Sequence, residues 1–166
     1  MLVGVLSGVC PNWGFRYTGV HVDDCWASKQ RDPMTGRMVP DPARFPSGMA
    51  ALGNYLVAKN LSFGLYTDQG TATCGGYPGS EGHEAVDAAT FAEWGVQYLK
   101  VDGCNAVPGA PGTQYPCCPS MPCFAEYARG YAAMGAAIRA AAYGNFRLNF
   151  HRFDRFELDL RGHTQP

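Results

Sequence analysis

The sequence is poor in charge and contains no long apolar run. Only 16% of its 166 residues are charged, and the 13 Lys and Arg nearly balance the 14 Asp and Glu, giving a formal net charge of −1. Without a basic run, we expect neither nucleic acid nor an anionic membrane surface as a partner. No apolar stretch approaches the roughly 20 residues that span a bilayer, so we expect no membrane-spanning helix.

Two further signals are weak or missing. The opening segment MLVGVLSGVC lacks the basic region and the cleavage site of a convincing signal peptide. The run CCPSMPC, Cys117 to Cys123, lacks the paired spacing of a zinc site, so we expect no metal ion there and no cofactor. The seven cysteines and the sequon at Asn60 nevertheless favour an oxidising compartment, in a secreted, lysosomal or vacuolar protein.

What is present describes a compact α/β protein. Hydrophobic residues make up 46% of the chain and aromatic residues 13%, enough for one domain with a core. Short β-branched or aromatic runs, each ending in aspartate, predict strands, and helical patterns lie between them. One helix begins near Pro46. The next spans 83–95 with Ala85, Ala89 and Ala92 on one face, and the third runs from about Phe124 to Ala142. The predicted strands are Tyr17–Asp24, Ser62–Asp68 and Val96–Asp102.

This alternation predicts βαβ units and a parallel sheet. The links from helix to strand are tight, near Asn60 and Gly95, whereas the links from strand to helix are long and rich in Gly, Pro and Cys. In parallel α/β folds the long loops after the strands build the active site at the carboxyl edge of the sheet. The acidic strand ends are therefore predicted to meet at one edge.

The residues at that edge suit two kinds of chemistry. Carboxylates around a pocket can bind sugar hydroxyls or stabilise an oxocarbenium-like transition state, and they can also hold a hard cation such as Mg²⁺. A metal-assisted α/β hydrolase is therefore an alternative hypothesis. The candidates at the three strand ends are Asp23 and Asp24, Tyr66 and Asp68, and Lys100 and Asp102.

Other candidates receive structural interpretations. Cys74 and Cys104 follow the second and third predicted strands on the same edge, where a disulfide would tie the two loops together. His21 is interpreted as a packed strand residue and His83 as a helix-start residue, since neither has a ligand partner at helical spacing.

Four stretches in order carry a resemblance to a known family. They are VHVDDCWA, RDPMTGRMVPDPARFPSGMAALGNYL, FGLYTDQGTATCGGYPGS and HEAVDAATFAEWGVQYLKVDGC. This order resembles glycoside hydrolase family 27, the α-galactosidases and α-N-acetylgalactosaminidases, from about Tyr17 to Cys104. The resemblance implies a fragment of a (β/α)8 TIM barrel, about strands two to four, within residues 1–142. It also implies retaining cleavage of terminal α-galactosides, small molecules or oligosaccharides, as the activity.

The same resemblance implies a role for each strand-end residue. Asp102 matches the catalytic nucleophile, and Lys100 matches a ligand of sugar hydroxyls whose positive charge should also keep Asp102 ionised. The remaining matches lie around the sugar. They are Asp23 and Asp24 for hydroxyls on its far side, Tyr66 in the wall, and the disulfide Cys74–Cys104 at the border of the pocket.

The departures from the family pattern also lead to expectations. Trp13 does not stand in the context of the family's first strand, and residues 143–166 form a divergent tail without a match. No acid/base aspartate is assigned, because the neighbours of Asp159 do not fit. We therefore expect a truncated, weakly active or inactive enzyme, or alternatively a galactose-binding remnant without catalysis. Nothing indicates the oligomeric state or a preference between galactose and N-acetylgalactosamine.

Overall fold

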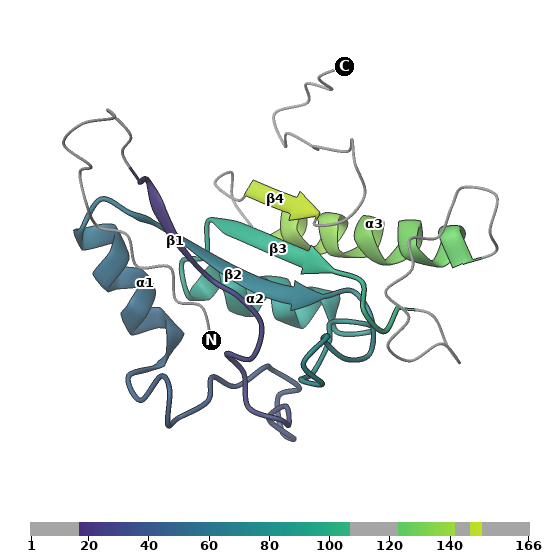
Figure 1. Cartoon of the computed structure of the whole chain (residues 1–166), viewed down its shortest axis with the longest axis horizontal. Helices are drawn as coiled ribbons and strands as arrows, with labels where there is room; N and C mark the ends of the chain where they lie inside the picture. Colours follow the sequence, from purple (N-terminus) through teal and green to yellow (C-terminus); the bar gives the residue numbers. More distant parts are fainter. Residues whose placement is uncertain (1–16, 107–122, 142–146, 151–166) are drawn as a thin grey trace, which may run out of the picture.

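The computed structural model describes residues 17–106, 123–141 and 147–150. Strands and helices alternate strictly along this part of the chain (Figure 1). The three predicted strands and three predicted helices are present, with ends within two or three residues of the expected positions. The elements are β1 (Gly19–Val22), α1 (Gly48–Ala58), β2 (Ser62–Asp68), α2 (Glu84–Glu93), β3 (Tyr98–Asp102), α3 (Cys123–Ala141) and β4 (Arg147–Phe150).

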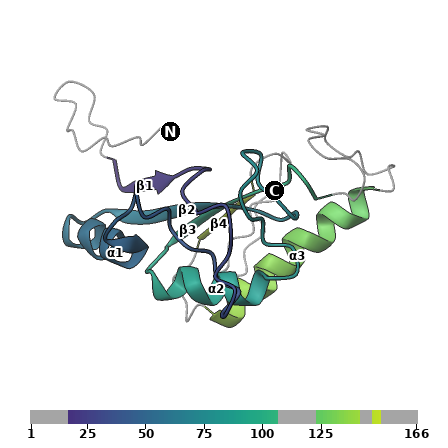
Figure 2. The ribbon, with the colours of Figure 1, turned by 90° about the horizontal axis from the view of Figure 1, so that it is seen from below.

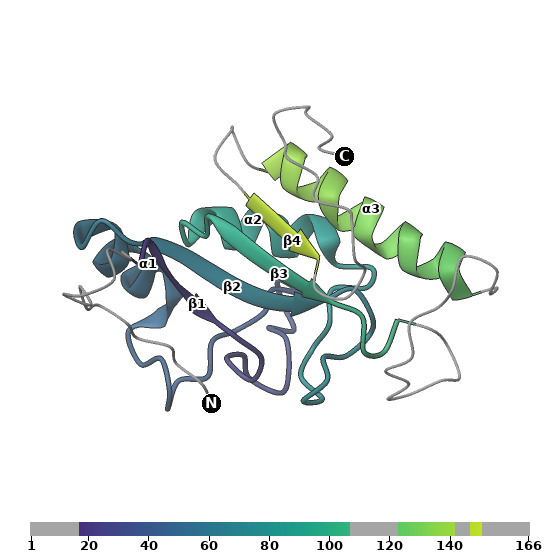
Figure 3. The same cartoon turned by 45° about the horizontal axis from the view of Figure 1, so that its top comes forward.

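The strands form one four-stranded parallel sheet in the order β1-β2-β3-β4. Strand β4 lies within residues 143–166, the predicted divergent tail. It pairs parallel to β3, with Tyr98 opposite Arg147. The sheet runs in sequence order from β1 to β4 and, within the described residues, does not close (Figure 3). This is the expected incomplete barrel, with one strand more than the sequence predicted.

All three helices cover the same face of the sheet (Figure 2). Side chains alternate between the two faces of a strand, so every second residue points toward the helices. These residues are almost completely buried: Phe63 and Leu65 from β2, and Leu99 and Val101 from β3. From the helices, the core receives Met49, Leu56, Ala88, Phe91, Met134 and Ile138.

The alanine face of α2 contributes little to the core. Ala85 and Ala89 are exposed, Ala92 packs partly against the core, and the buried residues are Asp87, Ala88, Thr90 and Phe91. Two polar residues of this buried face find partners in the loop after β1. Arg31 binds both oxygens of Asp87 at 2.6 and 2.7 Å, and Arg37 Nε donates to Thr90 Oγ1 at 2.8 Å. Paired polar groups can be buried, which periodicity of apolar residues cannot reveal.

The face of the sheet that the helices do not cover carries a row of packed residues. His21, Gly64 and Tyr98 lie in one row across β1, β2 and β3. The rings of His21 and Tyr98 lie 4.0 Å apart, centroid to centroid, above the glycine. A Cβ at Gly64 would come within 2.7 Å of the His21 ring, so only glycine permits this contact. His21 is therefore packed on Tyr98 as predicted, although much of its surface remains exposed.

The turns between helices and strands are as tight as the sequence predicted. Asn60 after α1 and Gly95 after α2 have φ angles of 56° and 76°, the left-handed conformation that ends many helices. Among the described residues, no helix combines the length and apolar character needed to cross a membrane.

Candidate active site

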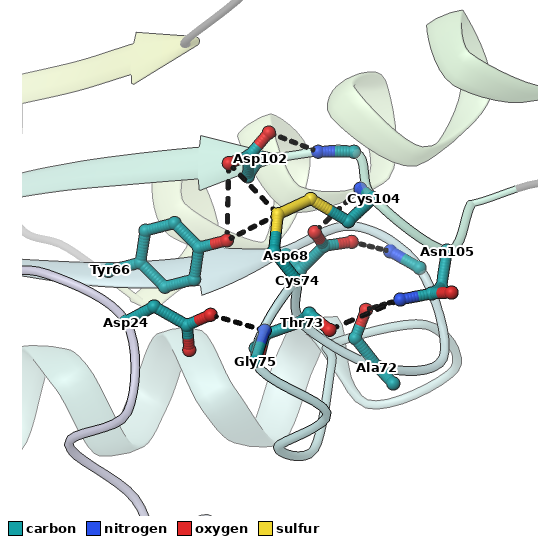
Figure 4. Close-up of a disulfide and its surroundings, with 12 residues drawn as sticks. Asp24, Tyr66, Asp68, Ala72, Thr73, Cys74, Gly75, Asp102, Cys104 and Asn105 are labelled. Carbon is teal, nitrogen blue, oxygen red and sulfur yellow. Dashed lines mark hydrogen bonds between the residues drawn. A yellow bond between two sulfur atoms is a disulfide. The ribbon is translucent and has the colours of Figure 1, made fainter. Parts of the chain in front are cut away.

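The strand-end residues meet at the carboxyl edge of the sheet (Figure 4). In the register of β2 and β3, Tyr66 lies opposite Lys100 and Asp68 opposite Asp102. The long loops after β1 and β2 surround this edge, as predicted. The structure thus brings together the candidates from three strands.

Asp102 ends β3 with its carboxylate partly open to solvent. The Tyr66 hydroxyl donates to Asp102 Oδ2 at 3.2 Å, and the backbone N–H of Gly103 donates to Oδ1 at 2.9 Å. Tyr66 is only 2% exposed. Burial, and next the negative charge of Asp102, raise the pKa of Tyr66 far above its usual value. The tyrosine therefore stays neutral, and donates to the carboxylate, at any physiological pH.

The predicted disulfide between Cys74 and Cys104 is present, with the two Cα atoms 5.2 Å apart. It joins the loop after β2 to the end of β3. Cys74 Sγ lies 3.6 Å from both the Tyr66 hydroxyl and Asp102 Oδ2. A disulfide sulfur carries no hydrogen, so toward Asp102 this is a packing contact that limits the carboxylate's movement. Cys25, by contrast, forms no disulfide within the part of the chain that the structure describes.

Lys100 pairs with Asp23 and not with Asp102. Its Nζ donates to both carboxylate oxygens of Asp23, at 2.9 and 3.0 Å, and lies 5.0 Å from the centre of the Tyr66 ring. The expectation that Lys100 directly supports the charge of Asp102 is thus not matched by its hydrogen bonds. The lysine side chain leans toward β1 because the Asp23 carboxylate lies there and accepts from Nζ with both oxygens.

Asp24 joins the two long loops. Its Oδ2 accepts a hydrogen bond from the backbone N–H of Gly75 at 2.8 Å, and its Oδ1 accepts one from Cys25 at 2.6 Å. Asp23 and Asp24 consequently face different partners, the first toward Lys100 and the second toward the loop after β2.

Asp68 is close to Asp102 but faces away from the open edge. The residue is completely buried. Its two oxygens accept hydrogen bonds from the backbone N–H groups of Gly70 and Cys104, at 2.8 and 2.7 Å. Burial is the main reason that the pKa of Asp68 rises to about 6. Grouping Asp68 with the pocket residues was wrong in this respect, because its carboxylate holds loop backbone and has no route to a bound ligand.

The geometry also bears on the metal hypothesis. Ligand atoms of Asp68, Cys74, Asp102 and Cys104 lie within 4.8 Å of one another. The two sulfurs are bonded to each other, however, so neither is a thiolate that could bind a cation. Asp68 already uses both oxygens, which leaves Asp102 alone, and one carboxylate does not make a Mg²⁺ site.

Sequence reasoning missed three basic residues that connect the loops. Arg31 donates to the carbonyl groups of Gly36 and Gly79 as well as to Asp87, and Lys29 lies 3.5 Å from the centre of the Tyr77 ring. Arg44 is the third. All three stand in the loop after β1, where no periodicity marks them, and the charge there gives no signal, since residues 23–47 hold four basic and four acidic side chains. Trp13, the cysteine run 117–118 and Asp159 lie outside the described residues.

A parallel sheet with its helices on one face (Figure 2) and carboxylates at its carboxyl edge is the arrangement found in a fragment of a TIM barrel. Residues 8–116, more than half of the chain, match the melibiase family described as α-galactosidase A. The chain therefore belongs to that family, glycoside hydrolase family 27.

Individual relatives agree with this assignment. The chain is 53% identical over 92 residues to a probable α-galactosidase A of Aspergillus terreus, covering 55% of this chain and 17% of that protein. It is 50% identical over 104 residues to the α-N-acetylgalactosaminidase of Gallus gallus, covering 62% of this chain and 25% of the relative. The chain thus spans a quarter or less of these two relatives.

Solved structures resemble the fold. The α-galactosidase of Saccharomyces cerevisiae with raffinose matches at a TM-score of 0.67 and 32% identity, over 81% of this chain and 26% of that one. A putative α-galactosidase of Bacteroides fragilis matches at a TM-score of 0.68 and 33% identity, over 81% of this chain and 25% of the other.

Proposed function

We propose that this chain carries the nucleophile and the sugar-binding wall of a retaining α-galactosidase or α-N-acetylgalactosaminidase site. The observation that supports this most strongly is the placement of Asp102. Its carboxylate stands at the open carboxyl edge, oriented by Tyr66 and backed by the disulfide, in a chain of the melibiase family.

In this proposal Asp102 acts as the nucleophile. One carboxylate oxygen attacks the anomeric carbon of a terminal α-galactosyl residue, and the bond from that carbon to the leaving oxygen breaks. The product is a galactosyl ester of Asp102, which water then hydrolyses to release the sugar with retained configuration. Tyr66 orients the carboxylate, and the Lys100–Asp23 pair and Asp24 offer donors and acceptors to the sugar hydroxyls.

The second carboxyl group of a retaining site must protonate the leaving oxygen, and it stands roughly 5–5.5 Å from the nucleophile. Asp68 lies near Asp102, with ligand atoms of the two within 4.8 Å of each other, and its pKa of about 6 would suit such an acid. Its complete burial and its two backbone hydrogen bonds exclude it from this role. Asp23 and Asp24 are assigned to the sugar hydroxyls in this proposal. We therefore assign no described carboxylate as the acid, and we expect hydrolysis of unactivated galactosides to be slow in this chain.

A nitrophenyl α-galactoside tests the proposed nucleophile separately from the need for an acid. Its leaving group departs as nitrophenolate without a proton, so the nucleophile alone can act. We expect the 166-residue chain to release nitrophenol slowly and to bind galactose. Asp102→Asn should abolish release while retaining binding. Release that persists in Asp102→Asn would contradict the proposal, and binding without any release would favour the galactose-binding remnant. The same assays with the N-acetylgalactosamine compounds determine the preferred sugar.

The proposal extends to the compartment. We infer that the chain works in an oxidising environment, secreted or in a lysosome or vacuole. The support is the Cys74–Cys104 bond beside the proposed nucleophile.

A further inference from the structure

The backbone has an unusual conformation immediately after the Asp23–Asp24 pair. Cys25 has a φ of 71°, a left-handed conformation that is unfavourable for a residue with a Cβ. Trp26, the next residue, is 3% exposed in the core, and its Nε1 donates to the carbonyl of Tyr66 at 2.8 Å. Cys25 is therefore the point where the chain passes from the pocket to the core.

An arginine side chain binds the carbonyl group at that point. Arg44 Nη1 donates to the carbonyl oxygen of Cys25. The direction of the guanidinium is fixed from the other side, because Nε and Nη2 both donate to Asp41 Oδ2, at 3.0 and 2.8 Å. Nη2 also donates to the Tyr77 hydroxyl at 3.2 Å, so the same group reaches the loop after β2. The rigid planar fork of arginine makes such a three-way contact, which the single ammonium of a lysine cannot reproduce.

The direction of Asp24 depends on the backbone that Arg44 holds. Asp24 Oδ1 accepts the N–H of Cys25, the same residue whose carbonyl Arg44 binds. Asp24 Oδ2 then reaches the N–H of Gly75 at 2.8 Å. If Cys25 relaxed out of the left-handed conformation, its N–H would turn and the carboxylate would lose one of its two anchors.

We propose that Arg44 is a positioning residue for galactose binding, which acts by holding the left-handed peptide at Cys25 and thereby the carboxylate of Asp24. The sugar-binding part of this inference rests on the proposed function. The positioning part rests on the hydrogen bonds alone and is tested separately.

The first measurement is amide hydrogen exchange in the full 166-residue chain, without ligand. The Gly75 amide reports on Asp24, whereas the Gly70 amide reports on Asp68 in the same loop. We expect Arg44→Met to speed exchange at Gly75 by about tenfold or more, the loss of one charge-assisted contact, and to leave Gly70 unchanged. Arg44→Lys should lie between the wild type and Arg44→Met.

A matched control comes from the same loop. Arg37 also connects this loop to another element, through Thr90 and Glu93 on α2, and these contacts are remote from Cys25. Arg37→Met should leave the exchange of Gly75 unchanged. It should also leave the galactose dissociation constant unchanged, whereas Arg44→Met should raise that constant about tenfold.

Each outcome decides the matter. Faster exchange at Gly75 alone, together with weaker galactose binding, supports the proposal. Unchanged exchange at Gly75 in Arg44→Met overturns it. Equal acceleration at Gly70 and Gly75 also overturns it, because Arg44 would then only stabilise the fold. If the wild type binds no galactose, the proposed function fails, while the exchange rates still decide whether Arg44 positions Asp24.

Discussion

Arg31 and Asp87 form a two-pronged ion pair that fastens the loop after β1 to helix α2, with the carboxylate completely buried and the guanidinium 13% exposed. Removing one partner of a buried pair leaves a charge without compensation and costs roughly 3–5 kcal/mol. We predict a loss of this size in the free energy of unfolding for Arg31→Met, measured by urea denaturation. Arg31→Met combined with Asp87→Leu should lose clearly less. If the double variant is as unstable as the sum of the single ones, the two residues do not act as a pair.

Asp68 should give the stability of this chain a recognisable dependence on pH. Its pKa is about 6 in the fold, raised mainly by burial and also by the charges of Asp102 and Asp24. An unfolded aspartate titrates near 3.9. Between these values the folded chain holds a proton that the unfolded chain has lost, so stability falls as pH rises from about 4 to about 6.

The isosteric Asp68→Asn isolates this contribution. It cannot titrate, and like a protonated aspartate it offers a single carbonyl acceptor to the N–H groups of Gly70 and Cys104. The free energy of unfolding of Asp68→Asn, relative to that of the wild type, should therefore rise by about 2–3 kcal/mol as pH rises from 4 to 6. Urea midpoints at several pH values measure this. A constant difference would mean that Asp68 titrates near its ordinary value.

The Lys100–Asp23 pair should matter for binding and hardly for stability. The two side chains are 22% and 54% exposed, and exposed pairs contribute about 0–1 kcal/mol. We predict that Lys100→Met changes the free energy of unfolding by less than about 1 kcal/mol. The same change should weaken galactose binding about tenfold or more, since the sugar loses a charged donor. Calorimetric titration and urea denaturation of the same samples check both halves. A large loss of stability would contradict the pair's assignment to the sugar.

Asn60 and Gly95 end helices α1 and α2 with the same left-handed conformation, at φ of 56° and 76°. This conformation costs an L residue roughly 1–2 kcal/mol, less for asparagine, and glycine nothing. We therefore predict that Asn60→Gly stabilises the chain by about 0.5 kcal/mol, and that Gly95→Ala destabilises it by roughly 1–2 kcal/mol. Thermal unfolding of both variants is the measurement. A stability loss in Asn60→Gly would show that the asparagine side chain makes a contact of its own.

The sequence predicted much of the fold because local signals agreed with the parallel arrangement. Runs such as SFGLYTD combine β propensity with a polar end, and tight turns at Asn60 and Gly95 require strands and helices to alternate. Strand β4 was missed because RLNF is short and lies beyond the family resemblance. A four-residue run becomes a strand when an open edge such as that of β3 is available, and the pattern within it is too short to show this.

The sequence predicted the position of the candidate site, but not the hydrogen-bond partners of its residues. Strand polarity alone brings Asp102 and Tyr66 to one edge. Whether a carboxylate faces solvent or backbone depends on loop conformation, as the contrast between Asp102 and Asp68 shows. Arg44 could not be predicted, because its partners stand 3, 19 and 33 residues away, two in its own loop and one in the loop after β2.

The register between β2 and β3 has a consequence for how this chain can change in evolution. Tyr66 lies opposite Lys100, and residues of odd and even position in β3 face opposite sides of the sheet. One residue inserted into β3 before Lys100 would turn Asp102 toward the helices and bring apolar Val101 to the pocket. Insertions after Asp102 or before Tyr98 leave this alternation intact. Descendants of this sequence can therefore vary in the length of their loops, while the five residues of β3 must be inherited without gain or loss.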